Sequence, residues 1–135
     1  MKTIQTLAWF VALGLVIAAA QAGGLSMPAP KRVAPPEVEP VTIGKLRVEA
    51  IHWGKERGLP QNGGYILARD ADSGKELWTL RIYRIDYDEK MESDVQDIFI
   101  DRLNRGAGPN TLEVVDERGR RFDVDLETRS VTPRS

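Results

Sequence analysis

Residues 64–78 read GYILARDADSGKELW and contain the pattern that decides the fold. Two segments rich in strand-forming residues flank the turn sequence DADSG, residues 70–74. After the turn, Trp78, Leu80 and Ile82 recur at every second position, so they share one face of a strand. Aspartate side chains accept hydrogen bonds from turn amides, and glycine adopts the positive φ that closes a bulged hairpin. This stretch therefore predicts an antiparallel β-hairpin.

The chain after Lys45 continues as short alternating segments separated by Gly, Asn and Asp. Residues 111–126, TLEVVDERGRRFDVDL, predict a second hairpin that turns at 117–119. Residues 45–53, KLRVEAIHW, place apolar side chains on both faces, which predicts a bulge or burial on two sides. We therefore predict an all-β domain, a small antiparallel sandwich or open barrel of about five to six strands.

Residues 89–106 leave two interpretations open. The apolar positions fit one face of a helix that Gly106 would end; they are Met91, Val95, Ile98, Phe99 and Leu103. The run Ile98-Phe99-Ile100, however, is rich in strand-forming residues. We favour a strand from Gln96 to Leu103, preceded by a turn or a short helical start. The alternative is an α+β fold with a helix near 89–105.

The first hairpin resembles the tryptophan-docking motif of pyrroloquinoline-quinone (PQQ)-type β-propellers. That motif runs Ala-x-Asp-x-x-Thr/Ser-Gly-x-x-x-Trp, and it is matched here by Ala68, Asp70, Ser73, Gly74 and Trp78. It occurs once, whereas propellers repeat it in every blade, and about 90 residues suffice for about two blades. The resemblance therefore implies local geometry only: Asp70 and Gly74 shape the turn, and Trp78 is buried against another sheet. We expect no quinone and no other cofactor.

The N-terminus has the features of a secretory signal peptide. Lys2 precedes the apolar run 7–20, and the small-residue motif AQA follows at 20–22. The run is shorter than the about 20 residues that span a bilayer. We expect cleavage after residue 22 and no membrane span thereafter, with retention as an anchor as the alternative. Residues 23–44 are interpreted as a proline-rich linker and 45–135 as the β domain, in a periplasmic or secreted protein.

The charge composition argues against a nucleic-acid partner. The chain carries 19 Lys and Arg against 20 Asp and Glu, and so balanced a charge produces no long-range field that attracts a polyanion. Arg118, Arg120 and Arg121 are close in sequence, but acidic neighbours surround them. The longer run 52–100 looks like small exported bacterial proteins without an assigned activity, and this resemblance implies no function.

Residues 53–64, WGKERGLPQNGG, form the candidate binding site. This connection contains four glycines, a proline and two amide side chains, and it exceeds the usual length of about 4–6 residues. Such loops bind ligands when a rigid sheet carries them, although many are only long connections. The candidate binding residues are His52, Trp53, Gln61 and Asn62, with Trp53 as the aromatic anchor.

Catalytic and metal-binding groups are sparse in this sequence. His52 is the only histidine, with Glu49 and Glu56 as its nearest acidic neighbours. A small hydrolase or metal-dependent enzyme that uses His52 is the alternative function. We expect no metal site; the weak calcium candidates are Asp86, Asp88, Glu89, Glu92 and Asp94.

These observations favour an exported binding module over an enzyme. The expected partner is an unidentified protein or peptide, which the loop and an exposed strand edge would contact. Exposed edges also pair between copies, so a homodimer is a further expectation.

Overall fold

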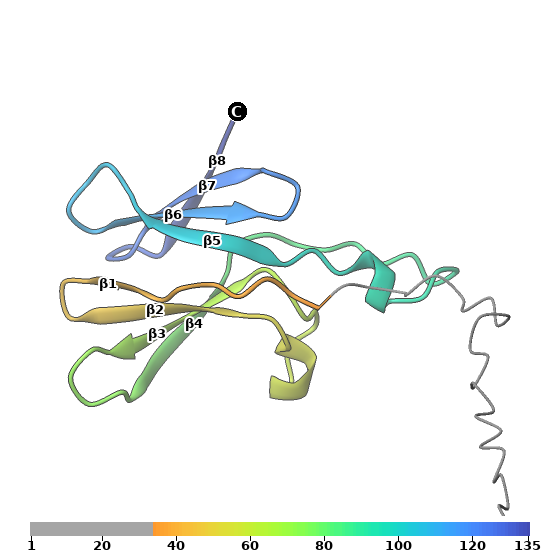
Figure 1. Ribbon diagram of the computed structural model, residues 1–135, viewed down its shortest axis with the longest axis horizontal. Coiled ribbons are helices and arrows are strands. Elements are labelled where there is room, and N and C mark those ends of the chain that lie inside the picture. The colour runs from red at the N-terminus through yellow and green to blue at the C-terminus, as the bar shows by residue number, and fades with distance from the viewer. Residues whose placement is uncertain (1–33) are drawn as a thin grey trace, which may run out of the picture.

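The computed structural model describes residues 34–135 as two four-stranded antiparallel sheets that pack face to face (Figure 1). The first sheet contains β1 (Val41–Ile43), β2 (Leu46–Ile51), β3 (Tyr65–Asp70) and β4 (Glu76–Arg81). The second contains β5 (Ile100–Arg105), β6 (Thr111–Asp116), β7 (Arg121–Asp125) and β8 (Ser130–Arg134). Both sheets join their strands in chain order, so each is a simple meander. The predicted all-β antiparallel sandwich is confirmed.

The sandwich contains two or three more strands than the sequence predicts, because its outer elements carry weak signals. β1 has three residues and lies within the stretch interpreted as a linker, so the first sheet begins at Val41 and not after Lys45. β8 includes Pro133, and proline is uncommon inside strands. Residues 1–33, which include the expected signal peptide, lie outside the described residues. Within residues 34–135, no helix is long and apolar enough to cross a membrane.

The α+β alternative is wrong, because residues 89–105 form no α-helix. They contain a single 3-10 turn, Asp94–Gln96, followed by β5. The strand that we favoured is present, but its ladder begins at Ile100 and not at Gln96. The helical pattern misleads because its first members, Met91 and Val95, are exposed. Of the apolar residues that follow, Ile98 and Leu103 belong to the main core, and Phe99 is buried against His52 and Trp53.

One core lies between the sheets and a second, smaller one lies outside the first sheet. The inward faces of the strands meet in the main core, in which Val48, Ile66 and Val124 are fully buried. On the other face of β2 and β3, Ile51 and Leu67 belong to the second cluster. β3 and the end of β2 are therefore buried on both faces. The cover over the second cluster is the loop 52–64, which carries the candidate site.

The turn at 70–74 has the geometry that its sequence predicts. The Asp70 Oδ1 atom accepts the N–H groups of Asp72 at 2.9 Å and Ser73 at 2.8 Å, and Gly74 has a φ of 75°. Trp78 lies opposite Ala68 on the neighbouring strand, packs against the main core and is half-buried.

The second sheet repeats this turn between β7 and β8, where the sequence motif is not evident. The Asp125 Oδ1 atom accepts the N–H groups of Glu127 at 2.9 Å and Thr128 at 3.1 Å. Arg129 takes the place of the glycine and has a φ of 59°. Its guanidinium carbon lies 4.8 Å from the centre of the Trp78 ring in β4, so the turn between β7 and β8 contacts the first sheet through a cation–π contact.

Candidate functional site

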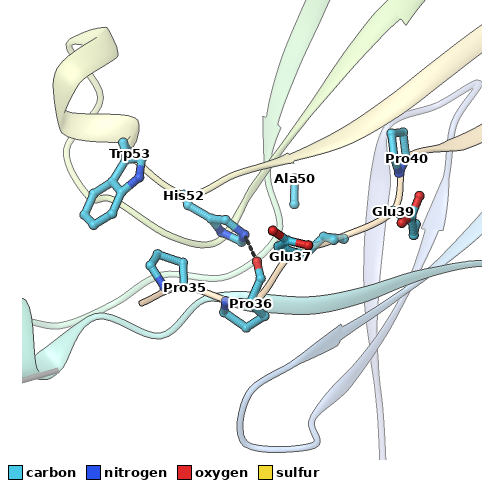
Figure 2. Close-up of a pocket in the computed structure, with 9 residues that line it drawn as sticks. Pro35, Pro36, Glu37, Glu39, Pro40, Ala50, His52 and Trp53 are labelled. Carbon is cyan, nitrogen blue, oxygen red and sulfur yellow. Dashed lines mark hydrogen bonds between the residues drawn. The ribbon is translucent and has the colours of Figure 1, made fainter. Parts of the chain in front are cut away.

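A groove runs along the edge of the first sheet, between the segment 35–40 and the last residues of β2 with those just after it (Figure 2). Its volume is about 480 Å³. Its lining consists of Pro35, Pro36, Glu37, Val38, Glu39, Pro40, Ala50, His52 and Trp53. Two of the four candidate residues, His52 and Trp53, therefore lie in one groove. A stretch that the sequence presents as a linker forms the opposite wall.

His52 connects the segment 35–40 to the first sheet through a hydrogen bond. Its Nε2 atom lies 2.8 Å from the carbonyl oxygen of Pro36 (Figure 2). Because a carbonyl only accepts hydrogen bonds, Nε2 carries the proton and Nδ1 is the unprotonated nitrogen. Nδ1 is buried and has no hydrogen-bond partner among the described residues. The ring also packs edge-on against Phe99, with 5.2 Å between the ring centres. This histidine is therefore a structural clamp in the groove floor.

Burial lowers the pKa of His52 below its usual 6.5, although the Pro36 carbonyl and Glu117 oppose this effect. The folded protein therefore binds this proton less readily than the unfolded chain does. We expect the free energy of unfolding to be highest above pH 6.5. It should fall as the pH drops from there towards the lowered pKa.

The ring signals of this single histidine should therefore titrate below pH 6.5 by NMR. In His52→Gln, whose amide can still donate to Pro36, the unfolding midpoint should change less between about pH 7 and pH 5 than in the wild type. A titration midpoint at or above pH 6.5 would contradict this account of the clamp.

Trp53 is the exposed aromatic residue of the groove. Its side chain remains 48% exposed although it packs edge-on against Phe99, with 5.7 Å between ring centres. Phe99 itself is fully buried and also supports His52. Figure 2 shows the indole at the end of the groove where Pro35 lies. A buried ring thus holds an exposed one in a fixed position, which limits the conformational entropy that Trp53 would lose on binding.

Gln61 does not line the groove; it holds the loop together from inside. Its side chain is 2% exposed. The Nε2 atom donates to the carbonyl oxygens of Gly63 at 2.9 Å and Tyr83 at 2.8 Å, and Oε1 accepts the N–H of Ile85 at 2.9 Å. The loop therefore depends on a buried amide that joins it to the chain after β4.

Asn62 is also a loop-bracing residue outside the groove. Its Nδ2 atom donates to Asp97 Oδ2 at 3.0 Å, and its Oδ1 accepts the N–H of Lys55 at 3.2 Å. Tyr87 donates its hydroxyl hydrogen to the other oxygen of Asp97. Burial, together with this hydrogen bond, raises the pKa of Tyr87 above its usual value, so the hydroxyl stays protonated. The amides of Gln61 and Asn62 are thus committed to the fold.

Two glycines allow the loop to pack this closely. A Cβ atom on Gly54 would lie 2.2 Å from the carbonyl oxygen of Gln61. A Cβ atom on Gly63 would lie 2.3 Å from the carbonyl oxygen of Ile98 and 2.9 Å from a ring carbon of Phe99. The glycine content of residues 53–64 therefore reflects close packing in a rigid loop.

The acidic segment 86–94 does not gather its carboxylates. Among the described residues, no three His, Cys, Asp or Glu side chains form a group that could hold a metal ion. Asp86 pairs with Arg84 at 2.8 Å, and Asp88 Oδ1 accepts the N–H of Lys90 at 2.9 Å. The side chain of Gln96 hydrogen-bonds backbone groups across this segment and braces it.

Comparison with known proteins adds no relative. No protein-family model matches the chain, and no curated protein matches it. The arrangement of the groove residues therefore provides the evidence on function.

Proposed function

We propose that this protein is an exported module that binds a protein or peptide segment in the groove, with Trp53 as the anchor. The observation that carries the proposal is the half-exposed indole, which the buried ring of Phe99 holds in place. Large aromatic residues that are fixed before binding contribute a large share of the energy of many protein interfaces. Trp53 combines exposure and rigidity in this way.

The shape and lining of the groove favour an extended peptide segment. The groove is about 480 Å³ in volume and open to solvent along its length, which suits a few residues of extended chain. Its outer wall contains Pro35, Pro36 and Pro40, which have no amide hydrogen to donate. Val38 and the carboxylates of Glu37 and Glu39 complete that wall. Polyproline-type segments dock into grooves lined by aromatic residues in other peptide-recognition domains, and Trp53 supplies an exposed aromatic ring here.

Export is part of the proposal and rests on the sequence of residues 1–22. A basic residue, an apolar run and small residues before the expected cleavage position support a periplasmic or secreted location. The partner would then be another exported or envelope protein. A second copy of this chain, paired through strand edges, is the competing partner.

Partner capture tests this proposal. The full chain, purified and immobilised, is exposed to envelope and extracellular extracts as wild type, Trp53→Ala and Leu77→Ala. Leu77 is a matched control, because it is 47% exposed on the edge strand β4 and does not line the groove. We expect one partner to be retained by the wild type and Leu77→Ala and lost with Trp53→Ala. Equal capture by all three proteins, or no specific partner of the wild type, would contradict the proposal.

A further inference from the structure

We infer that the groove selects a partner segment that presents a lysine or arginine side chain next to Trp53. This inference rests on the proposed function, because it names the chemistry of the segment that the groove would bind. It follows from the carboxylates around Trp53, from the pairing of the nearby cations and from the exposed indole itself.

Three exposed carboxylates lie in the two hollows that Trp53 lines, although Glu39 lies beside Pro40 at the end of the groove away from the indole (Figure 2). Glu37 and Glu39 line the groove on the side of the segment 35–40. Glu56 lines a smaller hollow of about 280 Å³, which shares Ala50, His52 and Trp53 with the groove. All three glutamates are exposed, and none has an ion pair with another described residue. Trp53 therefore lines two hollows: the groove, whose two carboxylates are Glu37 and Glu39, and a smaller hollow that Arg57 and Arg69 line together with Glu49 and Glu56.

The cationic side chains nearest to these hollows already have partners. Arg57 forms two hydrogen bonds of 2.9 Å with the carboxylate of Glu76. Arg69 pairs with Glu49 at 2.7 Å, and the Lys55 ammonium lies 4.5 Å from the centre of the Tyr87 ring. His52 is neutral above its lowered pKa. Among the described residues, no lysine or arginine lines the groove itself. The charged side chains that line it are those of Glu37 and Glu39, which complement a cationic side chain.

Trp53 adds a surface that a cation can occupy. Tryptophan has the most favourable aromatic face for a guanidinium or ammonium group. The same contact occurs elsewhere in this protein, where Arg129 lies over Trp78 at 4.8 Å. Trp53 lacks such a cover among the described residues and keeps 48% of its surface exposed. A partner's lysine or arginine placed there would contact the indole on the side of Glu37, and further basic residues of the segment would face Glu39 at the other end of the groove (Figure 2).

The test is a selection of displayed random decapeptides on the immobilised full chain, counter-selected against Trp53→Ala. We expect the retained peptides to be enriched in lysine or arginine.

One of these peptides would then be titrated calorimetrically into three proteins: the wild type, the double variant with Glu37→Gln and Glu39→Gln, and the control variant Glu89→Gln. Exposed charge pairs are individually weak, so we expect about three- to tenfold weaker binding to the double variant and no change in the control. Affinity should also fall as the ionic strength rises from about 0.01 to about 0.15 M.

The possible outcomes separate this inference from the proposed function. Trp53-dependent peptides without basic residues, or peptides that bind the double variant as tightly as the wild type, would overturn the inference and leave the proposed groove intact. If no retained peptide depends on Trp53, both would be overturned. A further matched peptide, with citrulline in place of its arginine, should bind more weakly because it keeps the shape and loses the charge.

Discussion

Gln61→Leu is expected to destabilise the protein by about 3 to 6 kcal/mol. The substitution leaves the N–H of Ile85 and the carbonyls of Gly63 and Tyr83 without their side-chain partner in a buried site. Each unsatisfied buried group costs about 1–3 kcal/mol. In a domain of this size, such a loss lowers the melting temperature by more than about 10 °C. Thermal unfolding of the purified variant measures the shift in melting temperature, and denaturant unfolding measures the loss of free energy of unfolding.

Gln96→Leu provides the matched control. The Gln96 side chain also hydrogen-bonds backbone groups, at the carbonyls of Asp88, Met91 and Glu92, but these contacts are exposed. Water can replace exposed hydrogen bonds, so we expect a loss of less than about 1.5 kcal/mol. Similar losses in the two variants would show that Gln61 is not the buried brace that its hydrogen bonds indicate.

Phe99→Ala is the second substitution with a large expected effect. Phe99 is fully buried and lies edge-on to both His52 and Trp53. Removing a buried phenylalanine ring costs about 3–5 kcal/mol. The substitution also removes the support of the exposed indole, so partner binding should weaken together with stability. Denaturant unfolding measures the loss of stability, and titration of the partner measures the loss of binding affinity.

Phe99→Leu separates these two effects. Leucine keeps the site apolar and fills most of it, so the loss of stability should stay near about 1–1.5 kcal/mol. The indole would still lose its aromatic contact and become less fixed. We expect a folded variant with weakened partner binding. Binding equal to that of the wild type would show that the ring of Phe99 does not position Trp53.

The alternation of apolar side chains made the sandwich predictable. Residues 64–82 and 111–126 carry strong period-two patterns with clear turns, and both form the hairpins that the sequence predicts. β1 and β8 were not predictable from local sequence. β1 has only three residues and β8 contains a proline, so each forms a strand because it pairs with its neighbour, β2 or β7. Local sequence carries little of that information.

The second copy of the turn departs from the sequence motif at three positions, where Asp123, Arg129 and Pro133 replace alanine, glycine and tryptophan. The sequence motif requires glycine at the position of positive φ, and the second copy has Arg129 there. A search for an aspartate followed three residues later by serine or threonine would have found both Asp70 and Asp125. The structure recovers the similarity because the hydrogen bonds that the turn amides donate to the aspartate are retained.

Half of the candidate site could be read from the sequence. A tryptophan beside a histidine at the start of a long loop is visible in the sequence, and the groove contains both residues. The amides of Gln61 and Asn62 looked equally available, because sequence does not reveal that they turn into the loop. The opposite wall of the groove depends on the contact between His52 and Pro36, 16 residues apart. Composition alone suggests a solvated linker there.

The dissociation constant of the captured partner is the most direct test of the groove as a binding site. It should be measured calorimetrically for the wild type, Trp53→Ala and Leu77→Ala, with the unfolding midpoint of each protein. An anchor residue contributes about 2 kcal/mol or more, so we expect Trp53→Ala to bind at least about 30-fold more weakly with an unchanged midpoint. Leu77→Ala should bind like the wild type. Affinities within about threefold for the wild type and Trp53→Ala, which is less than about 1 kcal/mol, would contradict binding through this groove.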